Sequence, residues 1–419
     1  MILDAVDILR QLDLAVFLYM FWHYVIFDFT RYSLSLIAVF ASAFVDRPHK
    51  PGDFIAPVSI ILAGFNEAPS LRHCAMSLRE QTLKDLELIV ADDGSTDKML
   101  KVAMELRKEG LIDKVVSSGI RGGKSSAVNL GLQYCSHDIV SVVDIDTSFD
   151  RDAFEQLIAH FADPKVGAVS GNLAVRNPDE TIMTRFQTIE YLLSISLGRR
   201  FTSMMGILSI VSGAFGAFRR QAVEAVGGWE VGPGEDADIT DKLRRAGWTI
   251  KFAPNAWSMT DVPIGFSAFA RQRLRWNRSV IRFRLRKYRP VFNPFSAAFS
   301  FKNMLAASNI LFYQVVLAMT FYVYVGWLFW AFEGKAVIIL AMTSLLYFLQ
   351  DLLSFALVCV LYKDQQPARY ALYILGYGLF ATFVQRAIRL YAYIDELIFR
   401  RSYSDSYVPA KVRDVTEIF

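Results

Sequence analysis

The sequence predicts an α/β domain with a mostly parallel sheet, attached to transmembrane and interfacial α-helices. Between residues 58 and 256, short apolar runs alternate with segments of helical periodicity. This alternation is typical of a parallel sheet that helices cover on both faces. Long apolar stretches flank the region, one before it and three after it, and 53% of the 419 residues are hydrophobic. A globular domain carried on membrane helices explains both observations.

The first apolar stretch spans residues 14–44 and is long enough for one long or kinked helix that crosses a bilayer once. Asp28 and Arg31 interrupt it, and we expect them to pair because they lie three residues apart on a helix. Two short spans hinged at this break are the alternative. Arg47 and Lys50 follow the stretch. Because basic flanks stay on the cytosolic side, the next domain is predicted to be cytosolic.

Three further apolar stretches lie near residues 304–332, 336–362 and 370–394. Gln350 and Asp351 interrupt the middle one, either as a functional intramembrane acid or as a packed polar pair. If all three stretches cross the membrane, the tail from residue 400 lies outside. Its basic residues argue for the opposite side, so the side of the tail stays open.

The basic run from Arg271 to Arg289 contains nine Arg or Lys residues and no acid. It directly precedes a hydrophobic stretch. We therefore interpret it as a membrane-surface helix with its cations near lipid phosphates, and not as a nucleic-acid footprint.

These patterns divide the chain into five parts and predict a multi-pass protein of the inner or plasma membrane. The parts are an N-terminal transmembrane segment (1–54), a cytosolic domain (55–260), interfacial helices (261–302), C-terminal transmembrane helices (303–396) and a tail (397–419).

Acidic clusters follow two of the predicted strands, at the edge where open α/β sheets bind ligands. Asp92-Asp93-Gly94-Ser95 follows the run Leu86–Ala91, and Asp144-Ile145-Asp146 follows the run Ile139–Val143. The first cluster can accept hydrogen bonds from a uracil N–H or from ribose hydroxyls, although such a run is often only a turn or a helix cap. The second places two carboxylates within reach of one hard cation that bridges to a diphosphate.

Three other segments carry candidate chemistry. Arg121-Gly122-Gly123-Lys124 can admit phosphate oxygens to its backbone and supply charge, or it is a flexible surface loop; it does not match the P-loop of NTPases. Glu235-Asp236 offers a carboxylate that could deprotonate an acceptor hydroxyl. Asp238 and Asp241 are expected on the following helix, in capping or solvated positions.

The segment Gln272-Arg273-Leu274-Arg275-Trp276 opens the basic run. Its arginines can offset the charge of a leaving diphosphate, and its tryptophan can stack on a sugar ring.

In order, spacing and membrane setting, these elements resemble the processive inverting glycosyltransferases of family 2. Cellulose, chitin-oligosaccharide, hyaluronan and poly-N-acetylglucosamine synthases belong to that family. The resemblance covers about residues 55–290 and the membrane layout, and it implies a GT-A-like sheet domain. The matching segments are Ala63–Glu67, Asp92–Ser95, Arg121–Lys124, Asp144–Asp146, Glu235–Asp236 and Gln272–Trp276, with lesser matches at Gln187–Tyr191 and Ser212–Gly216.

The resemblance also implies roles for individual residues. Those for the nucleotide-sugar are Ala63, Glu67, Asp92, Asp93, Lys124, Asp144 and Arg273. Those for a Mg²⁺ or Mn²⁺ ion are Asp144 and Asp146, and the catalytic ones are Glu235, Asp236, Gln272, Arg275 and Trp276, with Asp236 as the general base. Two positions depart from the family pattern: Phe65 replaces a frequent Tyr, and Gly234 replaces a frequent Thr.

The resulting hypothesis is a UDP-sugar-dependent hexosyltransferase that builds a β-linked polysaccharide and moves it across the membrane. UDP-N-acetylglucosamine is the favoured donor. The alternatives are a UDP-glucose polymer synthase, a transferase of single sugars to a lipid acceptor, and an inactive membrane partner or polymer channel. The expected partners are the donor, the growing polysaccharide and the bilayer, without nucleic acid; a need for accessory export proteins stays open.

Overall fold

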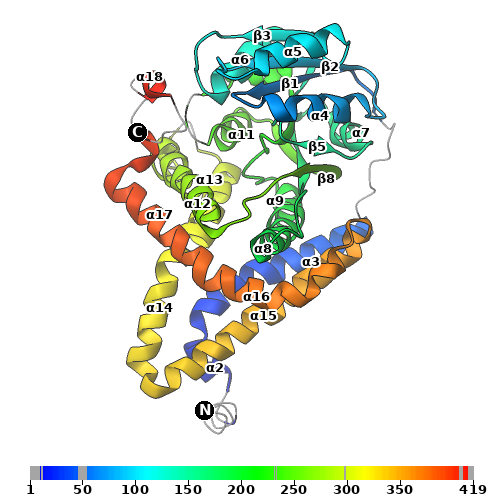
Figure 1. Cartoon of the computed structure of the whole chain (residues 1–419). Helices are drawn as coiled ribbons and strands as arrows, with labels where there is room; N and C mark the ends of the chain where they lie inside the picture. Colours follow the sequence, from blue (N-terminus) through cyan, green and yellow to red (C-terminus); the bar gives the residue numbers. More distant parts are fainter. Residues whose placement is uncertain are drawn as a thin grey trace.

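The computed structural model describes residues 10, 13–45, 54–230, 232, 234–296, 299–404 and 409–413. Within these residues, an α/β domain is stacked on a layer of long apolar helices (Figure 1). Arg47 and Lys50, which carried the prediction of orientation, lie outside the described residues, as do Pro233 and part of the tail.

The described strands form one eight-stranded mixed sheet with the order β3-β2-β1-β4-β7-β6-β8-β5. They are β1 (Val58–Gly64), β2 (Leu86–Asp92), β3 (Lys114–Ser117), β4 (Ile139–Val143), β5 (Ser148–Phe149), β6 (Val166–Val175), β7 (Phe215–Arg219) and β8 (Thr249–Thr260). Four neighbouring pairs are parallel, namely β1–β2, β2–β3, β1–β4 and β6–β8. Three are antiparallel, namely β4–β7, β5–β8 and β6–β7. The predicted mostly parallel sheet is therefore confirmed.

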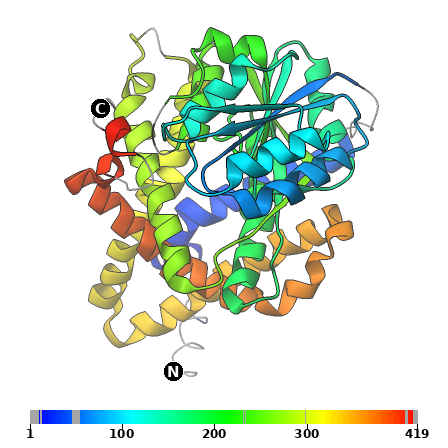
Figure 2. The same cartoon turned by 45° about the horizontal axis from the view of Figure 1, so that its top comes forward.

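Helices cover both faces of this sheet (Figure 2). They are α4 (Ala68–Arg79), α5 (Met99–Lys108), α6 (Lys124–Gln133), α7 (Ala153–Ile158), α10 (Arg220–Ala225) and α11 (Glu235–Arg245). Two more helices, α8 (Ile182–Glu190) and α9 (Gly198–Met204), lie between the sheet and the helical layer (Figure 1). Alternate residues of β1 point to opposite faces: Val58, Ile60 and Leu62 pack with α4 and α5, whereas Ile61 and Ala63 pack with α6 and α11. This two-sided burial explains why the strands are continuous apolar runs in the sequence.

The remaining helices form the layer below the sheet and its connection to it. They are α2 (Leu14–Met20), α3 (Thr30–Val45), α12 (Phe266–Val280), α13 (Phe301–Ile310), α14 (Leu317–Phe332), α15 (Ala336–Leu361), α16 (Ile374–Leu379) and α17 (Arg386–Phe399). The short helix α18 (Ala410–Arg413) lies beside the sheet domain instead (Figure 1). A π-helical stretch, η4 (Ile281–Lys287), continues α12 directly.

Three helical segments are long and apolar enough to cross a membrane, judged by length and composition: Tyr24–Ser42, Phe301–Leu361 and Pro367–Phe399. The second segment turns sharply between α14 and α15, where Glu333 adopts a φ of 44° (Figure 1). In the first segment, a π-helical stretch at Tyr24–Phe29 joins continuously to α3. The number of crossings and their direction stay predictions.

The predicted pair between Asp28 and Arg31 is wrong. Asp28 instead accepts a hydrogen bond of 2.8 Å from Arg386 of α17, and both side chains are buried. The Arg31 guanidinium lies over the Tyr313 ring. Gln350 donates to the backbone oxygen of Asp28, so this polar residue of α15 packs against the first segment. Asp28 therefore pairs with Arg386, which is remote in sequence, and not with its near neighbour Arg31.

The predicted positions of Asp238 and Asp241 are wrong, and the position expected for the cations of the basic run is wrong for Arg284 and Lys287. Cations of the basic run were expected near lipid phosphates, and Asp238 and Asp241 were expected in solvated or capping positions. In the structure both acids are buried, and they pair with Arg284 and Lys287 of η4. These two acids and the two cations that pair with them therefore neutralise one another, whereas Arg271 and Arg289 of the same run are exposed.

Candidate active site

The first site element is Asp92, the last residue of β2, whose side chain is almost fully buried. Its two carboxylate oxygens accept hydrogen bonds from the Ser95 backbone N–H at 3.1 Å and from the Ser117 hydroxyl at 2.7 Å. These donors fix the carboxylate while each oxygen keeps a further lone pair. The geometry suits an acceptor for N–H or hydroxyl donors of a ligand. Ser117 carried no signal in the sequence that marked it for this position.

The Asp93 carboxylate, which is predicted to bind the nucleotide-sugar, is engaged by the glycine loop. The backbone N–H groups of Gly122 and Gly123 donate to it at 2.7 and 2.8 Å. Burial raises the pKa of Asp93, although these two donors oppose the shift. Arg121 stacks on the Phe65 ring, with 4.1 Å between the guanidinium carbon and the ring centroid. Asp93 and Phe65 therefore hold the loop that begins α6.

Ala63, the other residue predicted near the nucleotide on β1, has its side chain in the core between β1 and α6. Its side chain is directed away from any ligand at the strand ends, so only its backbone is available there.

Lys124, the first residue of α6, is the cation at the centre of the site. Its ammonium donates to Asp144 at 2.6 Å and lies 3.9 Å from Glu235. Burial alone would lower the pKa of Lys124, but the charges of Asp144, Asp236 and Glu235 together hold it well above its usual value. Three segments that are remote in sequence thus meet as the strand-end rule predicts.

Asp236 lies beside Lys124 in the first turn of α11. Its carboxylate accepts a hydrogen bond of 2.9 Å from the Gly213 backbone N–H. A Cβ atom at Gly213 would lie 2.5 Å from the Asp236 carboxylate and 2.7 Å from the Lys124 ammonium, so a larger residue would displace these two groups. Burial raises the pKa of Asp236 to about 7, with Glu235 and Asp144 adding to the shift and Lys124 opposing it. A carboxylate with a pKa near neutrality is well matched to a general base.

Glu67 and Asp146 complete the acidic edge. Burial, together with the charges of Asp144 and Asp146, raises the pKa of Glu67 to about 7. Burial and Asp144 also raise the pKa of Asp146. Carboxylates whose charge is poorly compensated are the expected surroundings of a ligand cation.

We tested whether these residues fit a divalent ion. In the described part of the chain, no group of three or more His, Cys, Asp or Glu residues could hold a metal ion by itself. Mg²⁺ commonly takes one or two carboxylates and completes its shell with substrate phosphates and water. The carboxylates of Asp144 and Asp146 fit an ion that is completed by substrate phosphates and water. They do not fit an ion whose ligands all come from the protein.

The segment Gln272–Trp276 lies on α12, where Arg273 is largely buried. Arg273 donates to Glu190 of α8 at 2.8 Å and stacks on Trp276, whose ring centroid is 4.4 Å from the guanidinium carbon. Trp276 itself is 43% exposed. Arg273, which is predicted to bind the nucleotide-sugar, thus donates hydrogen bonds to Gln272 and Glu190. It orients a neighbouring ring that is open to a ligand.

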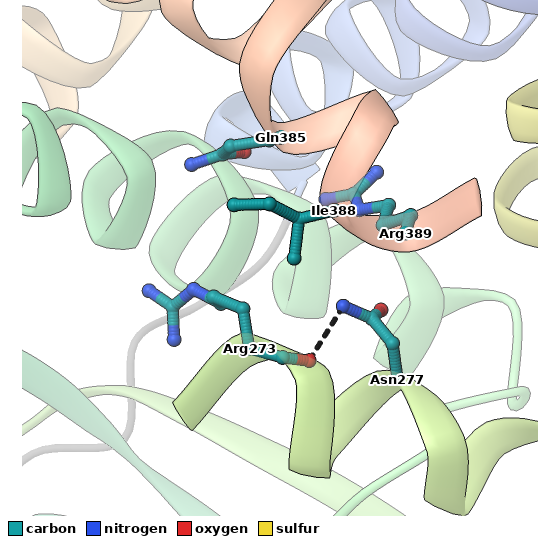
Figure 3. A pocket seen from close by; sticks show the side chains of 5 residues that line it. All are labelled: Arg273, Asn277, Gln385, Ile388 and Arg389. Carbon is teal, nitrogen blue, oxygen red and sulfur yellow. Dashed lines mark hydrogen bonds between the residues drawn. The ribbon is translucent and has the colours of Figure 1, made fainter. Parts of the chain in front are cut away.

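Glu190 also links this segment to the C-terminal helices, because Gln385 donates to it at 3.1 Å. Figure 3 shows Arg273 and Asn277 of α12 facing Gln385, Ile388 and Arg389 across a small pocket between α12 and α17. Asn277 donates to the Arg273 backbone oxygen there. The segment Gln272–Trp276 therefore packs against the C-terminal helices as well as against the sheet domain.

The comparisons with known proteins agree with this geometry. Residues 59–227 match the model described as glycosyl transferase family 2. This region is therefore similar to family 2 glycosyltransferase domains. A poly-beta-1,6-N-acetyl-D-glucosamine synthase from Staphylococcus epidermidis is 33% identical over 221 residues, which are 52% of this chain and 53% of the relative. The synthase from Staphylococcus aureus strain COL is 32% identical over 232 residues, 55% of this chain and 56% of that one. The chain thus spans about half the length of the curated relatives that it matches.

The GT-A-like fold predicted for the glycosyltransferase domain is also confirmed. The solved structure of the mannosyltransferase PcManGT from Pyrobaculum calidifontis, in complex with GDP-Man and Mn²⁺, superposes with a TM-score of 0.62. The superposition covers 90% of this chain and 99% of that one, at 20% identity. The likeness therefore extends past the sheet domain into the helical layer.

Proposed function

We propose that this protein is a membrane-embedded hexosyltransferase that polymerises a UDP-sugar on the cytosolic side into a β-linked polysaccharide and moves the polymer across the membrane. The observation that carries the proposal is the arrangement of Asp236. This carboxylate has a pKa raised to about 7 and lies against Lys124, next to Asp144. A base and a phosphate-binding cation side by side are what a direct displacement at a sugar carbon requires.

In the proposed reaction, Asp236 accepts the proton of an acceptor hydroxyl as that oxygen bonds to the anomeric carbon. The bond between this carbon and the diphosphate breaks, UDP leaves, and the configuration inverts. Lys124 and Arg275 offset the charge that develops on the departing diphosphate. Gln272 and Trp276 hold the acceptor sugar, and Glu235 supports the orientation of the site.

At the donor end, Asp92 receives the nucleoside and Glu67 lies beside the diphosphate path. Asp144 and Asp146 would hold a Mg²⁺ or Mn²⁺ ion. When bound, such an ion neutralises charge on the diphosphate. The Mn²⁺ in the PcManGT complex and the acidic edge of this site support a divalent ion.

We propose UDP-N-acetylglucosamine as the donor because the two staphylococcal relatives are synthases of poly-beta-1,6-N-acetyl-D-glucosamine. Export of the product through the molecule is supported by the position of Trp276. Trp276 lies on α12, and α12 packs on α17. The helix α17 belongs to one of the three candidate membrane spans.

The test uses purified full-length protein in proteoliposomes with Mn²⁺ or Mg²⁺. Radiolabelled UDP-N-acetylglucosamine and UDP-glucose are supplied separately, and the product is sized. A long polymer from UDP-N-acetylglucosamine supports the proposal, and a long polymer from UDP-glucose corrects the donor. A lipid that carries one sugar would replace polymerisation by single transfer. No UDP release with either donor would contradict the proposed activity.

A further inference from the structure

A buried cluster of acids and bases lies immediately behind Asp236, between α11 and η4. We name it the α11–η4 cluster and define it as Asp238, Asp241, Arg244, Arg284, Lys287 and Tyr288. Asp238 is 0% exposed and Asp241 is 2% exposed. Neither acid takes part in the reaction proposed above.

Each acid of the cluster binds groups of η4. Asp241 pairs with Arg284 and with Arg244 of its own helix. Asp238 pairs with Lys287 at 2.5 Å and accepts a hydrogen bond from the Tyr288 hydroxyl. Since Asp238 and Asp241 lie three residues apart, they occupy one face of α11. That face is directed at η4, while Asp236 is directed at Gly213.

Gly234, which directly precedes α11, also lies close to side chains of α12 and η4. A Cβ atom at Gly234 would lie 2.7 Å from the Phe283 ring and 2.9 Å from the Ser279 Cβ. Gly234 has a φ of 89°, so glycine suits the position both by conformation and by space. This contact accounts for the departure from threonine noted in the sequence.

The cluster continues away from α11 toward the helical layer. Arg244 donates to the Leu208 backbone oxygen at 2.8 Å and to Asn303 of α13 at 3.3 Å. On the other side of η4, Arg286 pairs with Glu396 of α17 at 2.7 Å. The helix that carries Gln272, Arg275 and Trp276 is thus tied to the helix of the base on one side and to the C-terminal helices on the other.

Buried ion pairs are a poor source of net stability, because the loss of hydration offsets much of their attraction. Buried ion pairs do strongly favour one alignment of two helices over others, since a shifted helix would leave a buried charge without its partner. A packed apolar interface would hold the two helices together with less directional control.

We propose that the α11–η4 cluster positions the helix that carries Asp236 against the helix that carries Gln272, Arg275 and Trp276. It sets the distance between the base and the groups that hold the acceptor and the departing diphosphate. The inference rests on the proposed function for its kinetic consequence, whereas its structural consequence can be measured independently. The members of the cluster are positioning residues and touch no reacting atom.

The test compares Asp241→Asn and Tyr288→Phe with the exposed-pair control Glu109→Gln, which breaks a salt bridge to Arg72 on the opposite part of the sheet domain. Tyr288→Phe removes one hydroxyl with little change of shape, so it stays informative if Asp241→Asn folds poorly. Spin labels are attached to two introduced cysteines, Ala246→Cys directly after α11 and Arg271→Cys on α12. Both positions are exposed. The background carries Cys359→Ser, because Cys74 and Cys135 are buried.

In the variants we expect a broadened or shifted distance distribution between the labels. We also expect kcat for sugar transfer to fall about tenfold or more, because small misplacements of reacting groups are costly, while KM for the donor stays within about twofold. The control should match the wild type in both readouts. An unchanged distance distribution, or a changed one with unaltered kcat, would overturn positioning. If the wild type transfers no sugar, the proposed function fails, and the distance measurement still decides whether the cluster sets the helix register.

Discussion

The strand-end site and the α11–η4 cluster use the same residue types with opposite charge balance. At the strand ends, Glu67, Asp144 and Asp146 lie near Lys124 and Arg176, and burial still raises the pKa values of Glu67 and Asp146. In the cluster, Asp238 and Asp241 each have basic partners at contact distance.

This difference separates function from architecture. An interior that serves only packing neutralises its charges, because an uncompensated buried charge is costly. A site that awaits a charged ligand keeps an imbalance that the ligand corrects. Burial of acids alone therefore does not identify a site, whereas burial with an unmatched charge does.

Among the variants that test this comparison, Asp236→Asn is expected to change kcat the most. The amide cannot accept the hydroxyl proton, so we expect kcat to fall by about 10³-fold, within the usual range for loss of a general base. Donor affinity should stay within about twofold, because the nucleoside end is held by Asp92. Transfer of radiolabelled sugar and UDP binding measure the two quantities.

Glu109→Gln, at the exposed residue that follows α5, is the matched control for the Asp236 variant and should behave like the wild type. Near wild-type turnover of Asp236→Asn would show that another group takes the proton. The charge imbalance at the strand ends would then need a different explanation.

Asp146→Asn should weaken the response to metal by about tenfold or more, because an ion that relies on two carboxylates loses one of them. The readouts are the metal concentration for half-maximal transfer and the rise of Tm when Mn²⁺ is added. Wild-type protein should gain thermal stability with Mn²⁺, and the variant should gain less. Asp152→Asn at the start of α7 is the control, and an identical Mn²⁺ response of wild type and Asp146→Asn would remove Asp146 from the site.

The strand-end half of this comparison could be predicted from the sequence. The apolar runs that form β2 and β4 end directly at Asp92 and Asp144, and the carboxyl ends of parallel strands meet at one edge. Local pattern and a general rule of sheet topology were sufficient there. The roles of Asp93 and Arg273 were not separable in this way, because a run of neighbouring polar residues does not say which one faces the ligand.

The cluster could not be predicted, for a physical reason. Asp241 and Arg284 lie far apart in the sequence, and each alone has the pattern of a solvated or membrane-facing helix surface. Asp28 and Arg386 repeat this situation across the helical layer. Ion pairs between remote segments depend on how helices pack, which periodicity does not reveal.

The pH dependence of kcat/KM gives a smaller expected effect. Since the pKa of Asp236 is raised to about 7, the base is protonated below that pH, and kcat/KM should fall about tenfold per pH unit there. Above pH 7 it should be level. Glu67 also has a pKa of about 7, so Glu67→Gln distinguishes it from Asp236. If Asp236 is the base, the pH dependence of kcat/KM should persist in Glu67→Gln. A level profile down to pH 5 in the wild type would contradict the assignment.

The sign of the accompanying change in stability follows from the same shift. A carboxyl group with a raised pKa in the folded state binds its proton more tightly after folding. Its contribution to stability is fully present below the unfolded pKa, about 4, and is lost as pH rises through about 7. The Tm of the metal-free protein should therefore decrease between pH 5 and pH 8, and less so in Asp236→Asn.

The smallest expected effect lies at Gly234, where the two regions meet. Gly234→Ala adds a Cβ atom within 2.7 Å of the Phe283 ring at a φ of 89°, and both the contact and the conformation should cost stability, together about 1–3 kcal/mol. We expect a Tm lower by several degrees and a loss of kcat of only a few-fold, because the cluster still holds the register. Adding Phe283→Leu should recover part of the Tm by relieving the contact, while the strain of the backbone remains. If Gly234→Ala leaves Tm unchanged, the two helices have room to separate, and the cluster cannot be setting their distance.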